Sequence, residues 1–118
     1  MKIPRASLRE MLFFILQDID EAYPALLDNA LQNLRGRVHK GVALALKSKV
    51  LLYAASPLFN TNEPYMDFGT NNNLICLNEP KNMVWWERAA AVADSCIRWA
   101  ETNGCYLITD QGVDANYQ

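Results

Sequence analysis

Residues 36–60, GRVHKGVALALKSKVLLYAASPLFN, decide the fold of this 118-residue chain. Alanine and leucine dominate the stretch between Gly41 and Phe59, and both residues favour helix strongly. The stretch is apolar on almost every side, and its polar interruptions are Lys47, Ser48, Lys49 and Ser56. Because a helix that is apolar all round lies inside a protein, we predict a central helix over about residues 39–56.

This central segment is too charged for a membrane span. A transmembrane helix needs about 20 residues that are almost free of charge, whereas this segment carries Lys40, Lys47 and Lys49. We therefore predict the most buried helix of a soluble protein, packed against helices on both sides. Lys47 should then reach solvent along its methylene stem or meet a carboxylate of a neighbouring helix. The residues expected to be covered are Val42, Leu46, Val50 and Tyr53.

Residues 7–23 predict an amphipathic helix before the central one. Ser7 and Glu10 match the capping box, in which the hydroxyl caps a backbone N–H and the carboxylate reaches back to the cap. The apolar positions recur at helical spacing, at Leu8, Leu12, Ile15, Ile19 and Ala22. Pro24 is expected to end this helix or to start a new short turn.

A third helix is predicted over about residues 83–103, with Asn82 as its N-cap and Gly104 as its C′ residue. Two apolar rows lie side by side along it. One row contains Trp86, Ala90, Ala93, Ile97 and Ala100, and the other contains Trp85, Ala89, Val92, Cys96 and Trp99. Since only the central helix is a certain neighbour, we expect exposed apolar surface and self-association of the chain.

Residues 60–82 form a long, asparagine-rich connection between the second and third helices. Loops longer than about 15 residues are uncommon in compact domains and tend to be functional or disordered. The candidate ligand-binding residues are Tyr65, Asp67 and Phe68. Their side chains could stack on a sugar and hydrogen-bond it, or the two aromatic rings could anchor the loop to its own helices. Trp85 is a further candidate contact at a helix start, whereas Trp86 and Trp99 are expected in the core.

The sequence offers no pattern for a metal ion or another cofactor. Three cysteines, at positions 76, 96 and 105, lack metal-ligand spacing, and a single histidine cannot complete the roughly four ligands of a zinc site. Cys96 falls on an apolar helix face, where a small buried hydrophobe is expected. A calcium site through Asp67 and residues 71–73 fails the EF-hand pattern.

Neither catalysis nor nucleic-acid binding is indicated. His39 could titrate near neutral pH, but without a nucleophile or a second histidine we expect it to be a cap or an exposed first-turn residue. A hydrolase would need two carboxylates at a defined separation, and the acidic residues Asp18, Asp20 and Glu21 instead mark a solvated helix face. The net charge of −2 does not provide the positive charge that nucleic-acid binding requires.

The three helices predict an all-α protein. Antiparallel helix pairs of this kind build tetratricopeptide-like α/α superhelices, although the repeat consensus is not matched in full. We therefore expect residues 1–118 to form a single helical segment, an antiparallel helix array with one long loop.

The central segment also resembles a known family. It is similar to the signature segment of the SusD/RagB family, which are glycan-binding outer-membrane lipoproteins of Bacteroidetes. The matching residues are Gly36-Arg37, Lys40-Gly41, Ala43, Ala45-Leu46-Lys47, Val50-Leu51-Leu52-Tyr53 and Ala54-Ala55-Ser56-Pro57-Leu58-Phe59-Asn60. Residues 5–7, 15–22 and 86–90 match further parts in the family's order. The chain departs from the family at His39, where a small hydroxyl residue is usual, and in being several times shorter.

The resemblance implies a function without chemistry. SusD-like proteins capture oligosaccharide at the cell surface and pass it to a TonB-dependent SusC-like transporter, which their tetratricopeptide-containing helical scaffold contacts. This chain would be that scaffold, with the signal peptide and lipid anchor absent from its sequence and most glycan contacts in regions that it lacks. The segment alone should therefore bind glycans weakly or not at all. The alternative is a free-standing helical protein-interaction module.

Overall fold

The computed structural model describes residues 4–28 and 36–107. Within these ranges the chain forms three α-helices, α1 (Leu8–Ala22), α2 (Lys40–Ala55) and α3 (Val84–Thr102), and two 3-10 helices, η1 (Tyr23–Ala25) and η3 (Gly69–Leu74). The described ranges contain no strand, so the predicted all-α class is confirmed. Each predicted α-helix is present and is one residue shorter at each end than expected. None of the helices in the described part of the chain has the length and apolarity that crossing a membrane requires.

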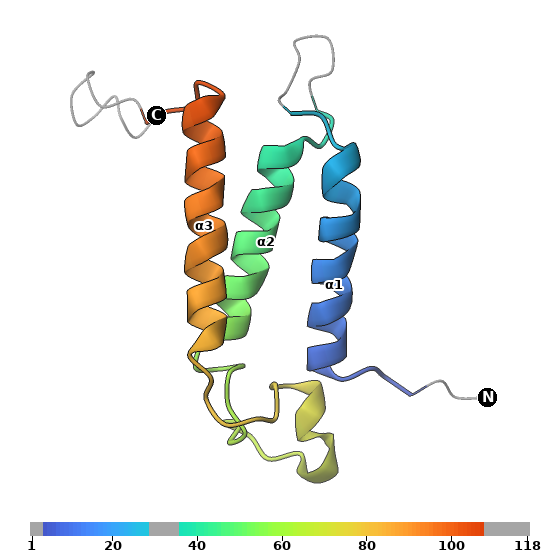
Figure 1. Ribbon diagram of the computed structural model, residues 1–118. Helices are drawn as coiled ribbons and strands as arrows, with labels where there is room; N and C mark the ends of the chain where they lie inside the picture. The colour runs from blue at the N-terminus through green and yellow to red at the C-terminus, as the bar shows by residue number, and fades with distance from the viewer. Residues whose placement is uncertain (1–3, 29–35, 108–118) are drawn as a thin grey trace.

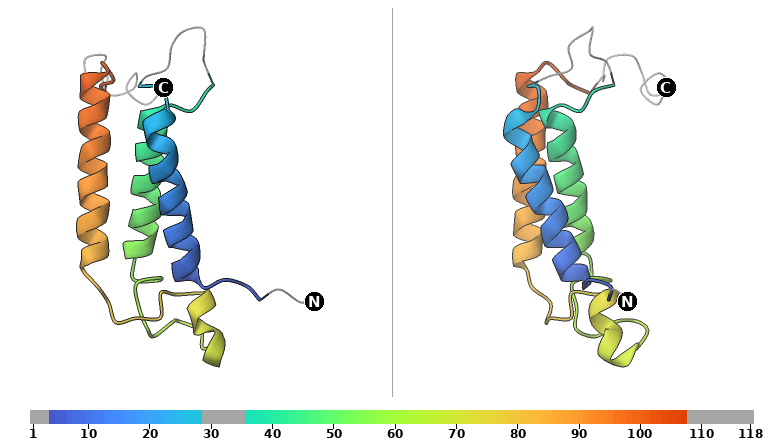
Figure 2. Two further views of the ribbon diagram at one scale, coloured as in Figure 1. Left: turned by 45° about the vertical axis from the view of Figure 1, so that its right-hand side comes forward. Right: turned by 90° about the vertical axis from the view of Figure 1, so that its right-hand side faces the viewer.

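Helix α2 lies between α1 and α3 and runs antiparallel to both, so α1 and α3 run in the same direction (Figure 1). Helix α2 packs most extensively on α3 and makes a smaller contact with α1. The right-hand view of Figure 2 shows α2 offset to one side of α1 and α3. The three helices therefore form a bent layer, and only one side of α2 is enclosed.

Helix α1 begins as the sequence predicts. The Glu10 backbone N–H donates to Ser7 Oγ at 3.2 Å, and the Ser7 backbone N–H donates to Glu10 Oε2 at 2.8 Å. This reciprocal pair is the predicted capping box. At the other end of the helix, Pro24 lies at the start of η1, so the predicted short turn after α1 is also confirmed.

Helix α3 ends in the predicted glycine cap. Gly104 has a φ of +73°, and the N–H groups of Gly104 and Cys105 donate to carbonyl oxygens of the last helical turn at 3.2 and 2.8 Å. Two such bonds around a left-handed residue form a Schellman motif. At the other end, Asn82 Oδ1 accepts the Val84 N–H at 3.0 Å, but the N-cap position itself belongs to Met83 rather than Asn82.

The core lies on the enclosed side of α2. Its members are Leu12, Leu16, Leu51, Ala54, Ala55, Leu77, Trp85 and Ala89. Trp85 is 4 % exposed, its ring centroid lies 6.0 Å from that of Phe13, and its Nε1–H donates to Glu79 Oε1 at 3.2 Å. The indole thus fills the space between α1 and α3. The expectation that Trp85 is a sugar contact is therefore wrong, because its ring is enclosed by protein.

Trp86 was expected in the core and lies instead at the surface, 36 % exposed. It belongs to the apolar row of α3 that also includes Ile97, which is 58 % exposed. The neighbouring row, with Trp85 and Ala89, is the one that faces the core. The two rows are adjacent on the helix, and the Trp86 row borders α2 only along a shallow groove beside Ser48 and Leu52, which leaves Trp86 and Ile97 exposed.

Helix α2 holds the largest set of buried residues, namely Gly41, Ala43, Leu51, Ala54 and Ala55. This agrees with its predicted central position, but the expectation that all its sides are covered is wrong. Val42, Leu46 and Tyr53 are 43, 49 and 58 % exposed. Of the four residues expected to be covered, only Val50 is partly buried. The reason is that α1 and α3 both pack on one side of α2, so its opposite side meets solvent.

Candidate functional site

The predicted binding loop is closed at its base by Asn60. This residue is 1 % exposed, its Nδ2–H donates to Asn82 O at 2.8 Å, and its Oδ1 accepts the Asn82 N–H at 2.9 Å. The Leu77 N–H donates to Phe59 O at 2.8 Å in the same region. We call the two Asn60–Asn82 bonds the Asn60 clamp. The clamp holds both ends of residues 60–82 together, so the loop leaves and returns to the helices at one point.

The tip of the loop is shaped by Asp67. Its Oδ1 accepts the Gly69 N–H at 2.8 Å and the Asn72 Nδ2–H at 3.0 Å, while Asn72 Oδ1 accepts the Phe68 N–H at 2.7 Å. The hydrogen bond from the Gly69 backbone, followed by that from Asn72, lowers the pKa of Asp67 below its ordinary value. One oxygen of this exposed carboxylate is therefore occupied by the turn into η3, and Oδ2 makes no hydrogen bond with the described residues.

The aromatic residues of the tip stand at the surface. Tyr65 is 81 % exposed and Phe68 is 50 % exposed, so neither ring anchors the loop. That role belongs to Cys76 and Leu77, which are 0 and 4 % exposed. Of the two alternatives that the sequence left open for these rings, anchoring is therefore wrong, and contact with a ligand stays a prediction.

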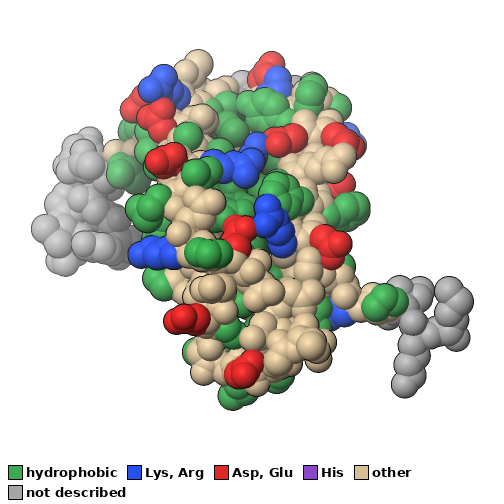
Figure 3. Space-filling model, turned by 60° about the horizontal axis from the view of Figure 1, so that its bottom comes forward, with side chains coloured by type: hydrophobic (Ala, Val, Ile, Leu, Met, Phe, Trp, Pro, Cys, Tyr) green, Lys and Arg blue, Asp and Glu red, His purple; other side chains and the backbone are tan. Residues whose placement is uncertain are grey.

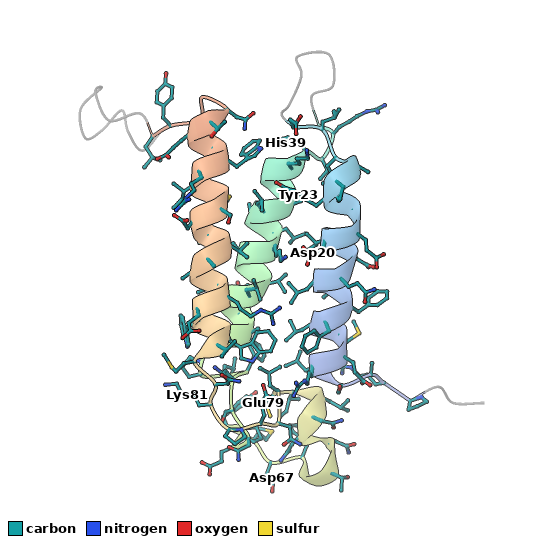
Figure 4. All side chains as sticks on the ribbon, viewed as in Figure 1. Asp20, Tyr23, His39, Asp67, Glu79 and Lys81 are labelled. Carbon is teal, nitrogen blue, oxygen red and sulfur yellow. The ribbon has the colours of Figure 1, made fainter. Side chains whose placement is uncertain are left out.

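The three predicted site residues share one end of the molecule. Tyr65, Asp67 and Phe68 are neighbours in the chain, and Figure 4 places Asp67 at the end of the helices opposite His39. Figure 3, which brings this end forward, shows hydrophobic side chains reaching the surface among polar and charged ones. The structure thus presents two exposed rings and a carboxylate on a short, hydrogen-bonded tip.

At the opposite end, Trp99 of α3 lies against the start of α2. Its indole ring stacks on the His39 imidazole, with ring centroids 5.1 Å apart and planes inclined by 16°. A β-carbon at Gly41 would lie 2.2 Å from the indole, so the glycine makes room for the ring. The Trp99 Nε1–H also donates to Asp28 O at 2.9 Å. These contacts fix the position of the indole.

His39 occupies the N-cap position of α2, but its side chain makes no cap hydrogen bond. Its ring is partly buried, and among the described residues Nδ1 has no hydrogen-bond partner. The expected cap position is therefore confirmed, but the side chain stacks on the indole of Trp99 instead of capping the helix. Sequence reasoning missed this contact, for which the signal was Gly41, a glycine inside an otherwise strong helix.

Two ion pairs join the first part of the chain to α2. Lys47 Nζ lies 2.5 Å from Asp20 Oδ1, which confirms the expectation that Lys47 meets a carboxylate of a neighbouring helix. Lys40 Nζ lies 2.5 Å from Asp28 Oδ1. The hydrogen bond that Lys40 donates to Asp28 raises the pKa of Lys40 above its ordinary value. Both pairs place a lysine of the apolar central helix beside a carboxylate that remains largely in water.

A hollow of about 350 Å³ opens between the three helices beside the Lys47–Asp20 pair. Tyr23 of η1 and Trp99 of α3 line it, and the buried Ala43 of α2 also borders it. Figure 4 shows Asp20 and Tyr23 on the side of α1 that faces α2. Sequence reasoning did not find this hollow, because its lining comes from three segments that are far apart in the chain.

The described residues contain no group of three or more histidine, cysteine, aspartate or glutamate side chains placed to hold a metal ion. All three cysteines are free thiols. Cys76 is buried, Cys105 is exposed, and Cys96, expected to be buried, is only partly so.

Comparison with solved structures shows a similarity to a Bacteroides protein. No protein-family model matches the sequence, and no curated protein matches it. Among solved structures, BT4246, a Bacteroides thetaiotaomicron protein, is similar to the chain with a TM-score of 0.65 and 29 % sequence identity. The match covers 85 % of this chain and 18 % of BT4246, so the chain spans less than a fifth of the length of that protein. The helical arrangement described above is therefore shared with part of a much longer Bacteroides protein.

Proposed function

We propose that this chain is the helical scaffold of a non-enzymatic, SusD-like glycan-binding protein that serves nutrient uptake at the cell surface. In this role it supports the binding loops and contacts a TonB-dependent transporter, while the full-length protein is lipid-anchored in the outer membrane. The signature-like segment forms α2, and the similarity to a Bacteroides protein agrees with this origin. Neither of these two points by itself identifies a partner.

The observation that carries the proposal is the uncovered side of α2. We define the α2 stripe as four large apolar residues, Val42, Leu46, Leu52 and Tyr53, which are 43, 49, 53 and 58 % exposed. A fully buried side chain of this size contributes about 1.5–3 kcal/mol, so covering the stripe would stabilise a complex by about 3–6 kcal/mol. Several large apolar side chains exposed along one helix are typical of a site of protein contact.

The surface continues onto α3. A groove of about 210 Å³ lies between the two helices, and its lining residues are Ser48, Leu52, Trp86, Ala89, Ala90 and Ala93. Small side chains along the groove and the larger Leu52 and Trp86 beside them suit the ridge of a neighbouring helix. Lys49, which is exposed on α2, forms no ion pair within the described part of the chain. A carboxylate of the partner would complete this surface.

The exposed tip of the loop supports the proposed contact with glycan. Tyr65 and Phe68 are exposed on a tip that Asp67 and the Asn60 clamp hold in shape. Exposed rings on an ordered loop suit stacking on a sugar, because less ordering free energy is lost on binding. Two rings are few, so this loop would add to a binding platform formed mainly elsewhere in the full-length protein.

A direct binding measurement tests the transporter contact. The chain, immobilised and exposed to the detergent-solubilised TonB-dependent transporter of the same organism, should bind it. The double variant Leu46→Glu, Leu52→Glu should weaken binding by more than about tenfold, since it places two charges in the apolar contact. Ala91→Glu, a similar change on an exposed position of α3, should bind like the original chain. Equal binding by all three proteins would overturn the proposal.

The alternative, a free-standing helical protein-interaction module, is favoured by the same α2 stripe. The two functions differ in genetic context and in partner. A lipoprotein signal upstream of this segment and a transporter gene beside it would support the SusD-like function. Binding of soluble helical partners to the stripe, with no binding to the transporter, would support the module instead.

A further inference from the structure

We propose that the hollow between α1, α2 and α3 is a binding site for one neutral, sugar-sized polyol. This site is separate from the Tyr65 loop tip and from the α2 stripe, and it does not depend on the function proposed above. It has a volume of about 350 Å³. With about 30 Å³ for each water-sized group, the space holds about a dozen non-hydrogen atoms, which is the size of one hexose.

The walls of the hollow are held by regular secondary structure. Its aromatic members are Tyr23, at the end of α1, and Trp99, on α3. Stacking on His39 and the hydrogen bond to Asp28 O fix the Trp99 indole before any ligand arrives. The Lys40 ammonium lies 5.7 Å from the centroid of the Tyr23 ring and restricts that ring as well. A pre-formed aromatic wall lowers the ordering cost of binding a small ligand.

Unused hydrogen-bonding groups surround the same space. Lys47 gives one N–H to Asp20 Oδ1 at 2.5 Å, which leaves two ammonium donors and the other carboxylate oxygen for a ligand. Ser95 Oγ donates to Ala91 O at 2.9 Å and can still accept. The Tyr23 hydroxyl forms no side-chain hydrogen bond with the described residues, so it can donate and accept. Both donors and acceptors therefore border the hollow, as the hydroxyl groups of a polyol require.

The charge of the site selects a neutral ligand. Lys47 and Asp20 neutralise each other in a direct ion pair at the hollow, and the other polar lining groups, Tyr23 and Ser95, are uncharged. The nearby Lys40 is likewise neutralised by Asp28. A charged ligand would meet no net countercharge and would have to break an existing pair. Apolar side chains such as Ile19 and Val92 complete the lining, and these suit the C–H face of a sugar ring.

Binding is expected to be weak because the ligand is small. A ligand of about a dozen non-hydrogen atoms at ordinary efficiency has a Kd on the order of 1 mM. The test is an NMR titration of the 118-residue chain with methyl β-glucoside and with myo-inositol, followed through the indole N–H signals. The Trp99 signal should shift and saturate, while that of Trp86, which lies outside the hollow, should stay in place. Sodium acetate and tetramethylammonium should leave both signals unchanged.

Variants separate the hollow from other binding sites. Ser95→Leu fills the opening and should weaken binding at least about tenfold, and Lys47→Met, which removes the ammonium donors, should weaken it as well. Thr102→Leu is the matched control, because Thr102 makes the same type of bond to the carbonyl one turn earlier but lies outside the hollow. It should bind like the original chain.

Two results would overturn the proposal. One is a Trp99 signal that does not move up to about 50 mM of either polyol, far above the expected Kd. The other is unchanged binding by Ser95→Leu, including binding that shifts only the Tyr65 and Phe68 signals. Neither result tests the proposed contact with the transporter. That contact is measured separately with the Leu46→Glu, Leu52→Glu variant.

Discussion

Gly41 and Trp99 meet so closely that a β-carbon on Gly41 would lie 2.2 Å from the indole ring. The absence of a side chain at one position of α2 therefore determines where α3 can place its last tryptophan. The same indole stacks on His39 and donates to Asp28 O, so this end of the helix layer depends on the contact.

We predict that Gly41→Ala destabilises the protein even though alanine is the better helix former. Displacing the indole should cost about 1–3 kcal/mol against a gain of at most about 1 kcal/mol in helix propensity, so we expect a net loss of up to about 2 kcal/mol in the free energy of unfolding. Urea unfolding followed by circular dichroism measures the difference. In a Trp99→Leu background the same substitution should be neutral or stabilising. Destabilisation of equal size in both backgrounds would show that the indole is not the cause.

Asn60→Ala should release the base of the loop. It removes the two hydrogen bonds of the Asn60 clamp, each worth about 0.5–1.5 kcal/mol, so we expect a loss of about 1–3 kcal/mol in the free energy of unfolding. Limited proteolysis should then cut within residues 60–82 much faster than in the original chain. Asn62→Ala, at an exposed position of the same loop, is the control and should change neither measurement.

The capping box should make the start of α1 sensitive to acid. The backbone N–H of Ser7, and then its hydroxyl, lower the pKa of Glu10 below its ordinary value of 4.5. A carboxylate with a lowered pKa stabilises the fold above its ordinary pKa, and this contribution is lost as the pH falls through the folded-state value. The Ser7 amide, followed by NMR, should lose its hydrogen-bonded shift below pH 4.5. Glu10→Gln should remove this transition, and its persistence in that variant would assign it to another group.

We predict that the chain associates with itself through the α2 stripe. Sedimentation velocity at rising concentration should show dimers or larger species, and the Leu46→Glu, Leu52→Glu variant should shift the distribution toward monomer. A dye that fluoresces on apolar surfaces should bind the original chain more strongly than the variant. A clean monomer at high concentration, without dye binding, would argue against an exposed contact surface.

Oligosaccharide binding by this chain alone should be weak or absent. Calorimetry against starch, mannan, xylan and host-type oligosaccharides should give no tight complex, because two exposed rings, Tyr65 and Phe68, cannot offset the ordering cost of a long glycan. A longer form of the protein, measured alongside, should bind its own glycan. Tight binding by the chain that disappears in Tyr65→Ala, Phe68→Ala would instead make the loop tip the principal site.

The positions of the helices could be predicted because each has local chemistry at its ends. The Ser7–Glu10 capping box and the left-handed Gly104 act within one turn, so their geometry follows from sequence spacing alone. The choice between Trp85 and Trp86 could not be predicted in this way. Both belong to apolar rows of α3, and only the offset of α2 in three dimensions decides which row is enclosed.

The candidate site was predictable to a similar extent. The loop and its exposed residues Tyr65 and Phe68 follow from composition, because a polar segment of this length cannot be buried. The Asn60 clamp and the hollow beside Asp20 and Lys47 depend on residues that are distant in the chain. The sequence also could not predict which side of α2 is uncovered. A helix that is apolar all round has no hydrophobic periodicity, so its sequence does not indicate which side packs against neighbouring helices.

The Asn60 clamp has a consequence for how this protein can diversify. Both ends of the loop are tied at one buried point, so the distance that the loop must span does not depend on its length. Doubling the number of residues between the ends would cost only about 0.6 kcal/mol in closure entropy. Insertions near Pro64 at the tip can therefore exchange one set of contact residues for another while α2 and α3 keep their packing. Within residues 60–82, Asn60, Cys76 and Leu77 must therefore stay constant, whereas the exposed stretch around Tyr65 is free to vary.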